Sequence, residues 1–447
     1  MATEKDKVPQ DGIILAKKTT VINSKTVNFA ELIPVNLLYF HSKSRFMLLF
    51  VKHFLFQAIV SSAIILMIVS GCNPVDNSPE HRALIVRDSL LKIDSLYKHR
   101  IDSIRIVKIK ESNERFPIIH YRRTALDKHL LDSIRRVYAK SPNTMDGYRA
   151  FTTVNRKDIQ YFRYGDTVMI PDTIIKDLRA YSFFPQYYPA GDSIKKILFV
   201  STKYQCYACY DSGSLVRFAA CNSGEEHKPS FSGRYAVNWK SRLRRSSLDS
   251  SWVLPFTVNF HLQAGSAFHQ FDMPGRPVSH SCIRQFIEDA EWLFKWCKGA
   301  KLDSNKQFIP FTGTPVLILD NFDYSRRSGG PWRDITTSKD VSIPLPEKPF
   351  EVEEALIPIS QIPLTSRGSL TNRKRYITAE DTLRARGLIR EGVSLRESID
   401  YNKLRRQKAL AKAQAEKAKK AEHKPEHIEK IPEKPTEKHI EEKTELK

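Results

Sequence analysis

The chain has 447 residues, of which 41% are hydrophobic, so it is long enough for more than one domain and at least one sizeable core. Its formal net charge of +22 would suit nucleic acid, anionic lipid or another acidic polymer as a partner. The sequence shows no helix-turn-helix, zinc-finger or RNA-binding aromatic signature. We therefore expect no nucleic-acid partner and attribute the charge to solvated helices and a Lys-rich tail.

An apolar run near the N-terminus predicts the compartment. Residues 54–69 form this run, which follows the basic Arg45 and Lys52 and ends in Val69-Ser70-Gly71-Cys72. A basic start, a short apolar stretch and small residues before a cysteine resemble a bacterial lipoprotein signal. The alternative is a transmembrane helix, but the run is shorter than the about 20 apolar residues that such a helix needs.

We place this signal at residues 47–72 and expect Cys72 to carry the lipid. Met47 sits where such signals begin, so residues 1–46 are expected to be an N-terminal extension that results from an over-long start. A lipid anchor implies a protein tethered to an envelope membrane in the periplasm, although the sequence does not say which membrane.

The periplasm is oxidising, which raises the question of disulfides. A disulfide among Cys206, Cys209 and Cys221 is one alternative, and small core cysteines are the other. Cys206-Tyr-Ala-Cys209 has the spacing of a metal-binding pair, but no second pair completes a zinc site. We therefore expect no metal, and Cys297 is left with the same open question about pairing.

Residues 73–145 are predicted to form a helical stalk. Val86, Leu90, Ile93 and Tyr97 recur at three- and four-residue spacing within a helix expected over residues 83–110. A second helix is expected over residues 125–139. The stalk is interpreted as an amphipathic or packing helix, with a partner-binding coiled coil as the weaker alternative.

Residues 146–193 change character. A helical turn is followed by Gly165-Asp166 and by a β-branched run that ends at Pro171. This order resembles the second half of a LysM module, a family that binds glycans built on N-acetylglucosamine. A small α/β cap that packs on the next domain is the equally weighted alternative.

Residues 194–322 are predicted to be mainly β. Short strands separated by turn residues are expected at residues 197–201, 206–210, 214–221, 234–239, 256–261 and 314–319. One helix is expected over residues 282–297. A cysteine at the N-terminus of a helix has its pKa lowered by the helix dipole, so this placement would activate Cys282.

The segment Ser279-His280-Ser281-Cys282-Ile283-Arg284, with His269 upstream, is the most informative part of the chain. A thiolate is the reactive form of cysteine, and a nearby imidazole can take the proton of the thiol. The segment resembles the Ser-His-Gly-Cys-Val/Ile-Arg signature of the L,D-transpeptidase (YkuD-type) catalytic domain. The closing run Gly313-Thr314-Pro315-Val316-Leu317-Ile318 agrees with that family.

The resemblance implies a mainly β domain that acts on peptidoglycan. Such enzymes form a cysteine thioester with a tetrapeptide stem, release the terminal D-alanine, and pass the acyl group to an amine on another stem or on a protein. No cofactor is implied.

The resemblance also implies a role for each residue of the motif. Cys282 would be the nucleophile and His269 the general base, while His280 would shape the pocket or share the duty of the base. The backbone N–H groups of Ser281 and Cys282 would face the oxyanion, next to Ser279. Arg284 would hold the loop or a substrate carboxylate.

Two residues complicate this assignment. Ser281 replaces the usual Gly of the signature, and a positive φ at that position would strain a serine. His261 is a rival base, because it ends a strand just upstream. Trp239 and Trp252 are expected to be core residues rather than platforms for sugars.

Two other functions remain open from the sequence. One is a non-catalytic lipoprotein that binds peptidoglycan. The other is an L,D-carboxypeptidase or amidase that uses water as the acceptor. Oligomeric state is not predicted by any pattern in the chain.

Residues 323–447 are predicted to form a Pro-rich linker and a charged, low-complexity tail. A charged helix is expected over residues 378–420, and residues 421–447 have too few apolar side chains to order themselves. The basic tail would lie along anionic polymer or lipid headgroups.

Overall fold

The computed structural model describes residues 78–246, 248–326 and 329–422. The predicted signal, its lipidation site Cys72 and residues 423–447 lie outside them, so the lipoprotein assignment stays a prediction. Within the described residues, no helix has the length and apolar character needed to cross a membrane. The chain divides into two compact units, Met1–Ser95 and Leu96–Lys447.

The predicted stalk helix is confirmed as α2 (Pro79–Glu114), a 36-residue helix that contains the boundary between the two units. None of its residues is buried. Its apolar side chains, among them Leu90, Ile93 and Tyr97, are exposed. The helix therefore contributes no core of its own in this chain.

A β-α-α-β unit follows. It comprises β1 (Tyr121–Ala125), α3 (Lys128–Val137), α4 (Met145–Asn155) and β2 (Thr167–Pro171). The two strands pair antiparallel, with Tyr121 opposite Pro171, over a core that includes Phe151 and Phe162. The Asp127 carboxylate accepts a 2.7 Å hydrogen bond from the Leu130 N–H and so caps α3.

The predicted boundary between stalk and cap at residues 145 and 146 is therefore wrong, because β1 and α3 belong to the same unit as α4 and β2. β1 was not predicted from the sequence because only Tyr121 of its five residues is buried. The strand therefore lacks the alternation of apolar and polar residues that marks a half-buried strand. Binding of glycan by this LysM-like unit stays a prediction.

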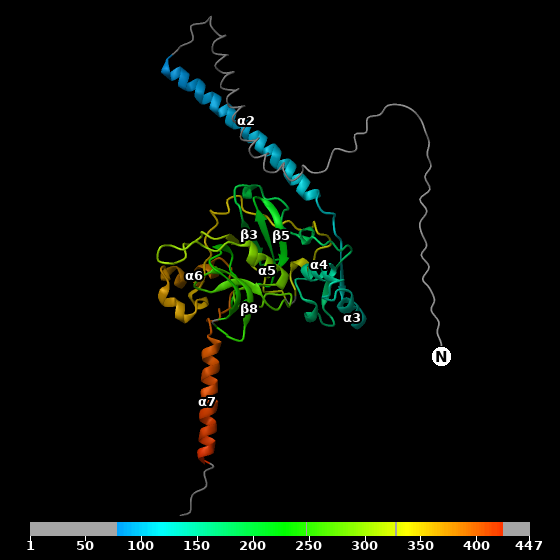
Figure 1. Cartoon of the computed structure of the whole chain (residues 1–447), viewed down its shortest axis with the longest axis vertical. Helices are drawn as coiled ribbons and strands as arrows, with labels where there is room; N and C mark the ends of the chain where they lie inside the picture. The colour runs from blue at the N-terminus through cyan, green and yellow to red at the C-terminus, as the bar shows by residue number, and fades with distance from the viewer. Residues whose placement is uncertain (1–77, 247, 327–328, 423–447) are drawn as a thin grey trace, which may run out of the picture. The chain divides into compact units, whose positions relative to one another are not determined.

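Two sheets form the centre of the second unit (Figure 1). The five-stranded sheet has the order β5-β4-β3-β11-β6, with β3 (Ile197–Ser201), β4 (Cys206–Asp211), β5 (Ser214–Ala220), β6 (Gly233–Ala236) and β11 (Pro315–Ile318). The four-stranded sheet has the order β10-β9-β8-β7, with β7 (Lys240–Arg245), β8 (Val253–His261), β9 (Ser266–Gln270) and β10 (Ile283–Gln285). The predicted mainly β domain is confirmed.

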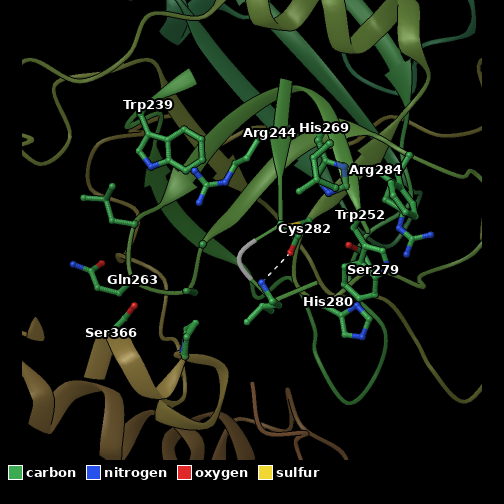
Figure 2. A pocket seen from close by; sticks show the side chains of 18 residues that line it. Trp239, Arg244, Trp252, Gln263, His269, Ser279, His280, Cys282, Arg284 and Ser366 are labelled. Atoms are coloured by element: carbon green, nitrogen blue, oxygen red, sulfur yellow. Dashed lines mark hydrogen bonds between the residues drawn. The ribbon is translucent and has the colours of Figure 1, made fainter. Parts of the chain in front are cut away.

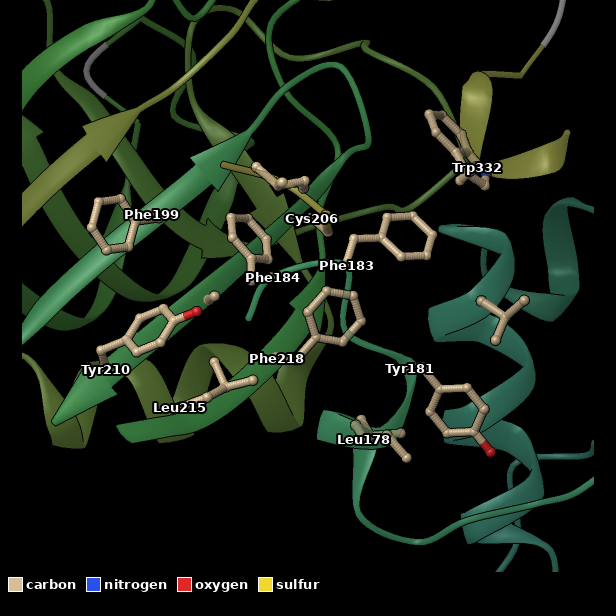
Figure 3. Packing of buried hydrophobic residues seen from close by; sticks show 14 of the residues in the cluster. Leu178, Tyr181, Phe183, Phe184, Phe199, Cys206, Tyr210, Leu215, Phe218 and Trp332 are labelled. Carbon is tan, nitrogen blue, oxygen red and sulfur yellow. The ribbon is translucent and has the colours of Figure 1, made fainter. Parts of the chain in front are cut away.

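Two hydrophobic clusters cover the faces of the five-stranded sheet. One joins it to the four-stranded sheet, since Leu198 and Val316 from one sheet share this cluster with Phe268 and Ile283 from the other. The second lies on the opposite face. In Figure 3, Phe199, Tyr210 and Phe218 project from the sheet toward Phe183 and Phe184.

The cysteines are distributed between these two clusters. Cys206 belongs to the outer cluster, whereas Cys209, Cys221 and Cys297 belong to the cluster between the sheets. All four are buried and free, so the alternative of small core cysteines is the one observed. Since Cys206 and Cys209 point to opposite faces, they do not form a metal-binding pair.

The predicted helix over residues 282–297 begins later than expected. Strand β10 comes first, and α5 spans Ile287–Trp296. Ile283 and Phe286 fit helical spacing, but Ile283 and Gln285 are buried on either side of Arg284, which is a strand pattern. Cys282 therefore precedes a strand and is not at the N-terminus of a helix.

The prediction of a linker after residue 322 is wrong for residues 331–398. Ile343, Ala355, Ile357, Ile362 and Leu383 are buried in the two main clusters. This stretch contains the short 3-10 helices η4 (Pro331–Arg333), η5 (Ile359–Gln361) and η6 (Leu364–Ser369), followed by α6 (Arg373–Ala385). The sequence analysis missed these core residues because the segment is rich in proline and its apolar residues follow neither helical nor strand spacing.

The predicted charged helix is divided in two. Gly387 and Gly392, at φ +69° and +74°, separate α6 from the basic α7 (Tyr401–Glu422). Residues 386–400, between these two helices, are not helical.

Candidate active site

The pairing of β9 with β10 places the motif. The two strands are parallel, with Phe268 opposite Ile283 and His269 opposite Arg284. Cys282 immediately precedes β10, so its thiol lies beside β9, where the backbone of Ala267 hydrogen-bonds to it. The adjacent strands β9 and β10 thereby bring together residues that are 15 positions apart in the sequence, such as His269 and Arg284.

Cys282 opens into a pocket of about 260 Å³ (Figure 2). Five of the six predicted site residues line it: Cys282, His269, His280, Ser279 and Arg284. Ser281 is buried behind the wall of this pocket. The sequence motif therefore corresponds to a single cavity.

The environment of Cys282 raises the pKa of its thiol. Burial is the main cause, and it outweighs the Ala267 hydrogen bond and the positive charges of Arg284, Lys228 and Arg244, which favour the thiolate. The predicted activation by a helix dipole is wrong, because β10 separates Cys282 from α5. The resting thiol is thus protonated at neutral pH and needs a base.

His269 lines the same pocket as Cys282, and its tautomer can be assigned. Its Nδ1 lies 3.0 Å from the Gln270 carbonyl oxygen, and a carbonyl only accepts, so Nδ1 carries the hydrogen and Nε2 the lone pair. Burial lowers the pKa of His269 to about 4. The imidazole is therefore neutral at neutral pH, with its lone pair on Nε2.

The rival His261 is held in a different role. It does not line this pocket, and its Nδ1 accepts a 3.1 Å hydrogen bond from the Ala264 N–H within the β8–β9 turn. Its ring packs against Tyr235 and Tyr376. The geometry assigns His261 to the structure of the turn.

His280 shapes one wall of the pocket. Its ring stacks on Trp252, with the ring centroids 5.4 Å apart, and meets the edge of Tyr401 at 6.3 Å. Its Nε2 lies 3.9 Å from a Glu225 carboxylate oxygen. Held in this way, His280 is a wall residue of the pocket.

Ser281 has a positive φ of +70°, the conformation that a glycine adopts without strain. Its Oγ lies 2.8 Å from the Ser266 Oγ, and its carbonyl accepts a 3.1 Å hydrogen bond from the Ser230 hydroxyl. The Ser281 N–H donates to the Lys228 carbonyl at 3.0 Å. The predicted oxyanion role of this N–H is therefore wrong, because the N–H is already used.

Arg284 holds the loop that precedes the motif. Its guanidinium donates to the carbonyls of Asp272 at 3.4 Å and Val278 at 3.2 Å, and it stacks on the Phe271 ring. Of the two predicted roles, the structure shows the one in which Arg284 fixes the loop.

Asn222 connects this loop to its surroundings. It exchanges two backbone hydrogen bonds with Arg284, at 2.9 and 3.0 Å, and its side chain accepts from the Gly275 N–H at 3.0 Å. Its amide also donates to the Arg156 carbonyl, at 3.1 Å, in the β-α-α-β unit. Ser279 is anchored next to it, since its N–H donates to the Ser223 carbonyl at 3.0 Å. These contacts fix the backbone on both sides of the motif.

Sequence reasoning missed several residues of this region. Trp239 and Trp252 were expected in the core but line the pocket, together with Arg244. Lys228 is buried near Cys282, and burial lowers its pKa to about 8. No spacing rule connects these residues to the motif, because strand pairing and loop packing bring them there.

The C-terminal segment also reaches the site. The Lys228 ammonium donates to the Ser398 hydroxyl at 3.1 Å, and the Arg396 N–H donates to the His227 carbonyl at 2.8 Å. Tyr401 packs on Trp252. Two residues of the predicted tail, Pro363 and Ser366, line the pocket itself.

The described residues contain no group of three or more His, Cys, Asp or Glu side chains that could hold a metal ion. The pocket is lined by the thiol of Cys282 and the imidazoles of His269 and His280.

This geometry agrees with a comparison of the sequence with known families. Residues 195–318 match the L,D-transpeptidase catalytic domain, YkuD. The resemblance predicted for residues 194–322 is thereby confirmed, and we call residues 195–318 the YkuD domain. A search of curated proteins found no match.

Similar solved structures include an L,D-transpeptidase from Mycobacterium smegmatis, with 13% identity and a TM-score of 0.24, over 28% of this chain and 59% of that one. An L,D-transpeptidase (Yku) from Stackebrandtia nassauensis has 18% identity and a TM-score of 0.24, over 29% of this chain and 58% of that one. L,D-transpeptidase 3 from Mycobacterium tuberculosis, in complex with a faropenem-derived adduct, has 20% identity and a TM-score of 0.22, over 28% and 60%. The chain thus spans 58 to 60% of the length of these structures.

Proposed function

We propose that the protein is an L,D-transpeptidase that uses Cys282 to form a thioester with tetrapeptide stems of peptidoglycan. The observation that supports this most is that one pocket is lined by both Cys282 and a neutral His269, whose Nδ1–H is fixed on the Gln270 carbonyl. A nucleophile, a base and a group that orients the base are the parts that acyl transfer needs.

The first half-reaction forms the thioester. Nε2 of His269 takes the proton of the Cys282 thiol, and the thiolate attacks the carbonyl of the bond before the terminal D-residue. When the tetrahedral intermediate collapses, the proton passes to the leaving amine and D-alanine departs. The stem remains joined to Cys282 as a thioester.

The second half-reaction releases the product. An amine on another stem or on a protein attacks the thioester, a new amide forms, and the sulfur leaves as a thiolate that regains its proton. The acceptor is the point at which a transpeptidase differs from a carboxypeptidase, because the carboxypeptidase uses water at this step.

Positive charges around the pocket suit the two negatively charged species of the reaction, the thiolate and the oxyanion. The positive charges of Arg284, Lys228 and Arg244 favour the thiolate, although burial outweighs them in the resting protein. The charges of Arg284 and Lys228 would also stabilise an oxyanion on the bound substrate. Because burial keeps the resting thiol protonated, we expect the thiolate to form only as the proton moves to His269.

The location of the protein forms part of this proposal. A lipid on Cys72 would tether the chain to an envelope membrane in the periplasm, where peptidoglycan is available. The LysM-like unit would then hold the glycan near the YkuD domain.

The test is an analysis of muropeptides by mass spectrometry after incubation of the purified protein with a disaccharide-tetrapeptide and an acceptor stem. We expect cross-linked dimer and free D-alanine from the wild type, and neither from Cys282→Ala. If tripeptide forms without dimer, the protein is a carboxypeptidase. If the wild type and Cys282→Ala give identical muropeptides, the protein is not a cysteine acyltransferase, and a binding lipoprotein remains.

A further inference from the structure

Arg244 is a half-buried cation in the wall of the Cys282 pocket. It lies on β7 opposite Leu254, and its guanidinium stacks on the Trp239 ring, 4.4 Å from the centroid. No carboxylate in residues 78–246, 248–326 and 329–422 pairs with Arg244. The stack fixes the plane of the guanidinium and leaves its N–H donors without an anionic partner.

Arg284, the other arginine of the pocket, is occupied. Its guanidinium already donates to two backbone carbonyls and stacks on Phe271. In Figure 2, Arg244 and Trp239 lie to one side of Cys282, and His269 and Arg284 lie to the other. Of these two arginines, Arg244 is thus the one whose charge faces the pocket without a committed role.

The acidic side chains around the pocket do not neutralise Arg244. The described residues that line the pocket include no Asp or Glu. Asp249, in the β7–β8 turn, pairs with Arg405, and Glu225 pairs with Arg396 at 2.8 Å. The wall therefore presents a positive charge that fits an anionic group on a ligand.

We propose, on the basis of the proposed function, that Arg244 binds a carboxylate of the donor stem and so selects donors that carry a free carboxylate close to the scissile bond. A guanidinium can bind a carboxylate through two parallel hydrogen bonds, which adds direction to the charge attraction. The Trp239 stack holds the guanidinium ready and reduces the entropy lost on binding.

Two carboxylates of the donor have this chemistry. One belongs to the terminal D-residue, which leaves with the amine, and the other belongs to the diamino residue of the stem. Amidation removes the charge of either group and leaves the rest of the peptide intact. A pair of amidated donors therefore distinguishes the two sources.

The experiment measures kcat/KM for acylation of Cys282 with three tetrapeptide donors: the free acid, the terminal amide and the amide of the diamino residue. Arg244→Gln should lower kcat/KM for the free acid by roughly 10- to 100-fold, since a hydrogen bond to a charged group contributes about that factor. For the donor that lacks the recognised carboxylate, the same substitution should change kcat/KM less than about twofold. Arg244→Lys should restore part of the loss.

The matched control is Arg242→Gln, on the same strand, where the arginine is exposed and does not line the pocket. This variant should behave as the wild type with all three donors. Equal losses with every donor for Arg244→Gln, or no loss with any, would overturn the proposal.

A binding measurement separates this proposal from the proposed function. In the Cys282→Ala background, calorimetry with the free acid should show affinity that falls by roughly 10- to 100-fold when Arg244→Gln is added. If affinity falls in this way but none of the three donors acylates Cys282 of the wild type, the transpeptidase assignment fails and the carboxylate site stands. If donors acylate Cys282 but neither rate nor affinity depends on Arg244, only the carboxylate site fails.

Discussion

Replacement of Ser281 by Gly and by Ala tests the conformation of the loop that carries the nucleophile. At φ +70°, a residue with a side chain strains the backbone and lowers the free energy of unfolding by roughly 1–2 kcal/mol. Gly at this position would remove that strain. Either substitution removes the 2.8 Å contact with the Ser266 hydroxyl, worth roughly 1 kcal/mol. The added freedom of Gly in the unfolded chain costs roughly 0.5–1 kcal/mol.

Together, these contributions predict different free energies of unfolding for the two variants. Ser281→Gly should unfold within about 1 kcal/mol of the wild type, because the recovered strain offsets the two losses. Ser281→Ala keeps the strain and loses the contact, so it should be destabilised by roughly 1 kcal/mol. Gly should therefore be more stable than Ala at this position by roughly 1 kcal/mol, the reverse of the usual order.

The assay is urea unfolding followed by circular dichroism, with Ser304→Gly and Ser304→Ala as controls. Ser304 is exposed and has no positive φ, so Gly should be the less stable variant there, by roughly 0.5–1 kcal/mol. If Ser281→Gly is less stable than Ser281→Ala, the loop does not hold the left-handed conformation, and the reasoning about this residue fails.

Three further predictions concern charge. Alkylation of Cys282 by iodoacetamide should keep rising with pH to above 9, because burial raises the pKa of the thiol, and a plateau below pH 7 would instead indicate a resting thiolate. His269 should lower the free energy of unfolding by roughly 3 kcal/mol as the pH falls from 6.5 to about 4, because the unfolded imidazole binds a proton that the buried one does not. His269→Gln should show a smaller fall over this range. An equal fall in the variant would mean that another group causes it. Asp289→Ala should destabilise the protein by roughly 3 kcal/mol in urea unfolding, since Arg217, 3.0 Å away, would lose its buried partner, whereas a loss below about 1 kcal/mol would contradict a buried ion pair.

The sequence predicted those parts of the site that depend on local pattern. The strand at Ile197–Ser201 was placed at its observed bounds, because five consecutive apolar or small residues between turn signals are typical of a buried strand. Cys282, His269 and His280 were found because the motif keeps its chemistry within 14 residues. The sequence also identified Ser281 in place of the usual glycine, with strain expected if this position has a positive φ, which the structure shows.

The rest depended on tertiary contacts. Strand β10 has only three residues, and only its parallel pairing with β9 distinguishes it from the start of α5. β7 is polar and partly exposed, so no strand pattern marks the element that carries Arg244 in the sequence. Proximity between such residues arises from folding and has no counterpart in local spacing.

The C-terminal region shows the same limit. Its composition suggested a linker, yet Ile357 and Ile362 complete the core between the sheets, and Ser398 reaches Lys228. A few apolar residues spaced without a period suffice to fix a long segment when a preformed surface is available to receive them. Composition alone does not distinguish such a segment from one that stays solvated.

The intact mass of the protein after incubation with a tetrapeptide donor tests the assignment of Cys282 most directly. We predict a gain equal to the donor mass less one D-alanine, located on the Cys282 peptide, absent from Cys282→Ala and removed when an amine acceptor is added. No gain in the wild type, or the same gain in Cys282→Ala, would contradict the account of Cys282 as the nucleophile.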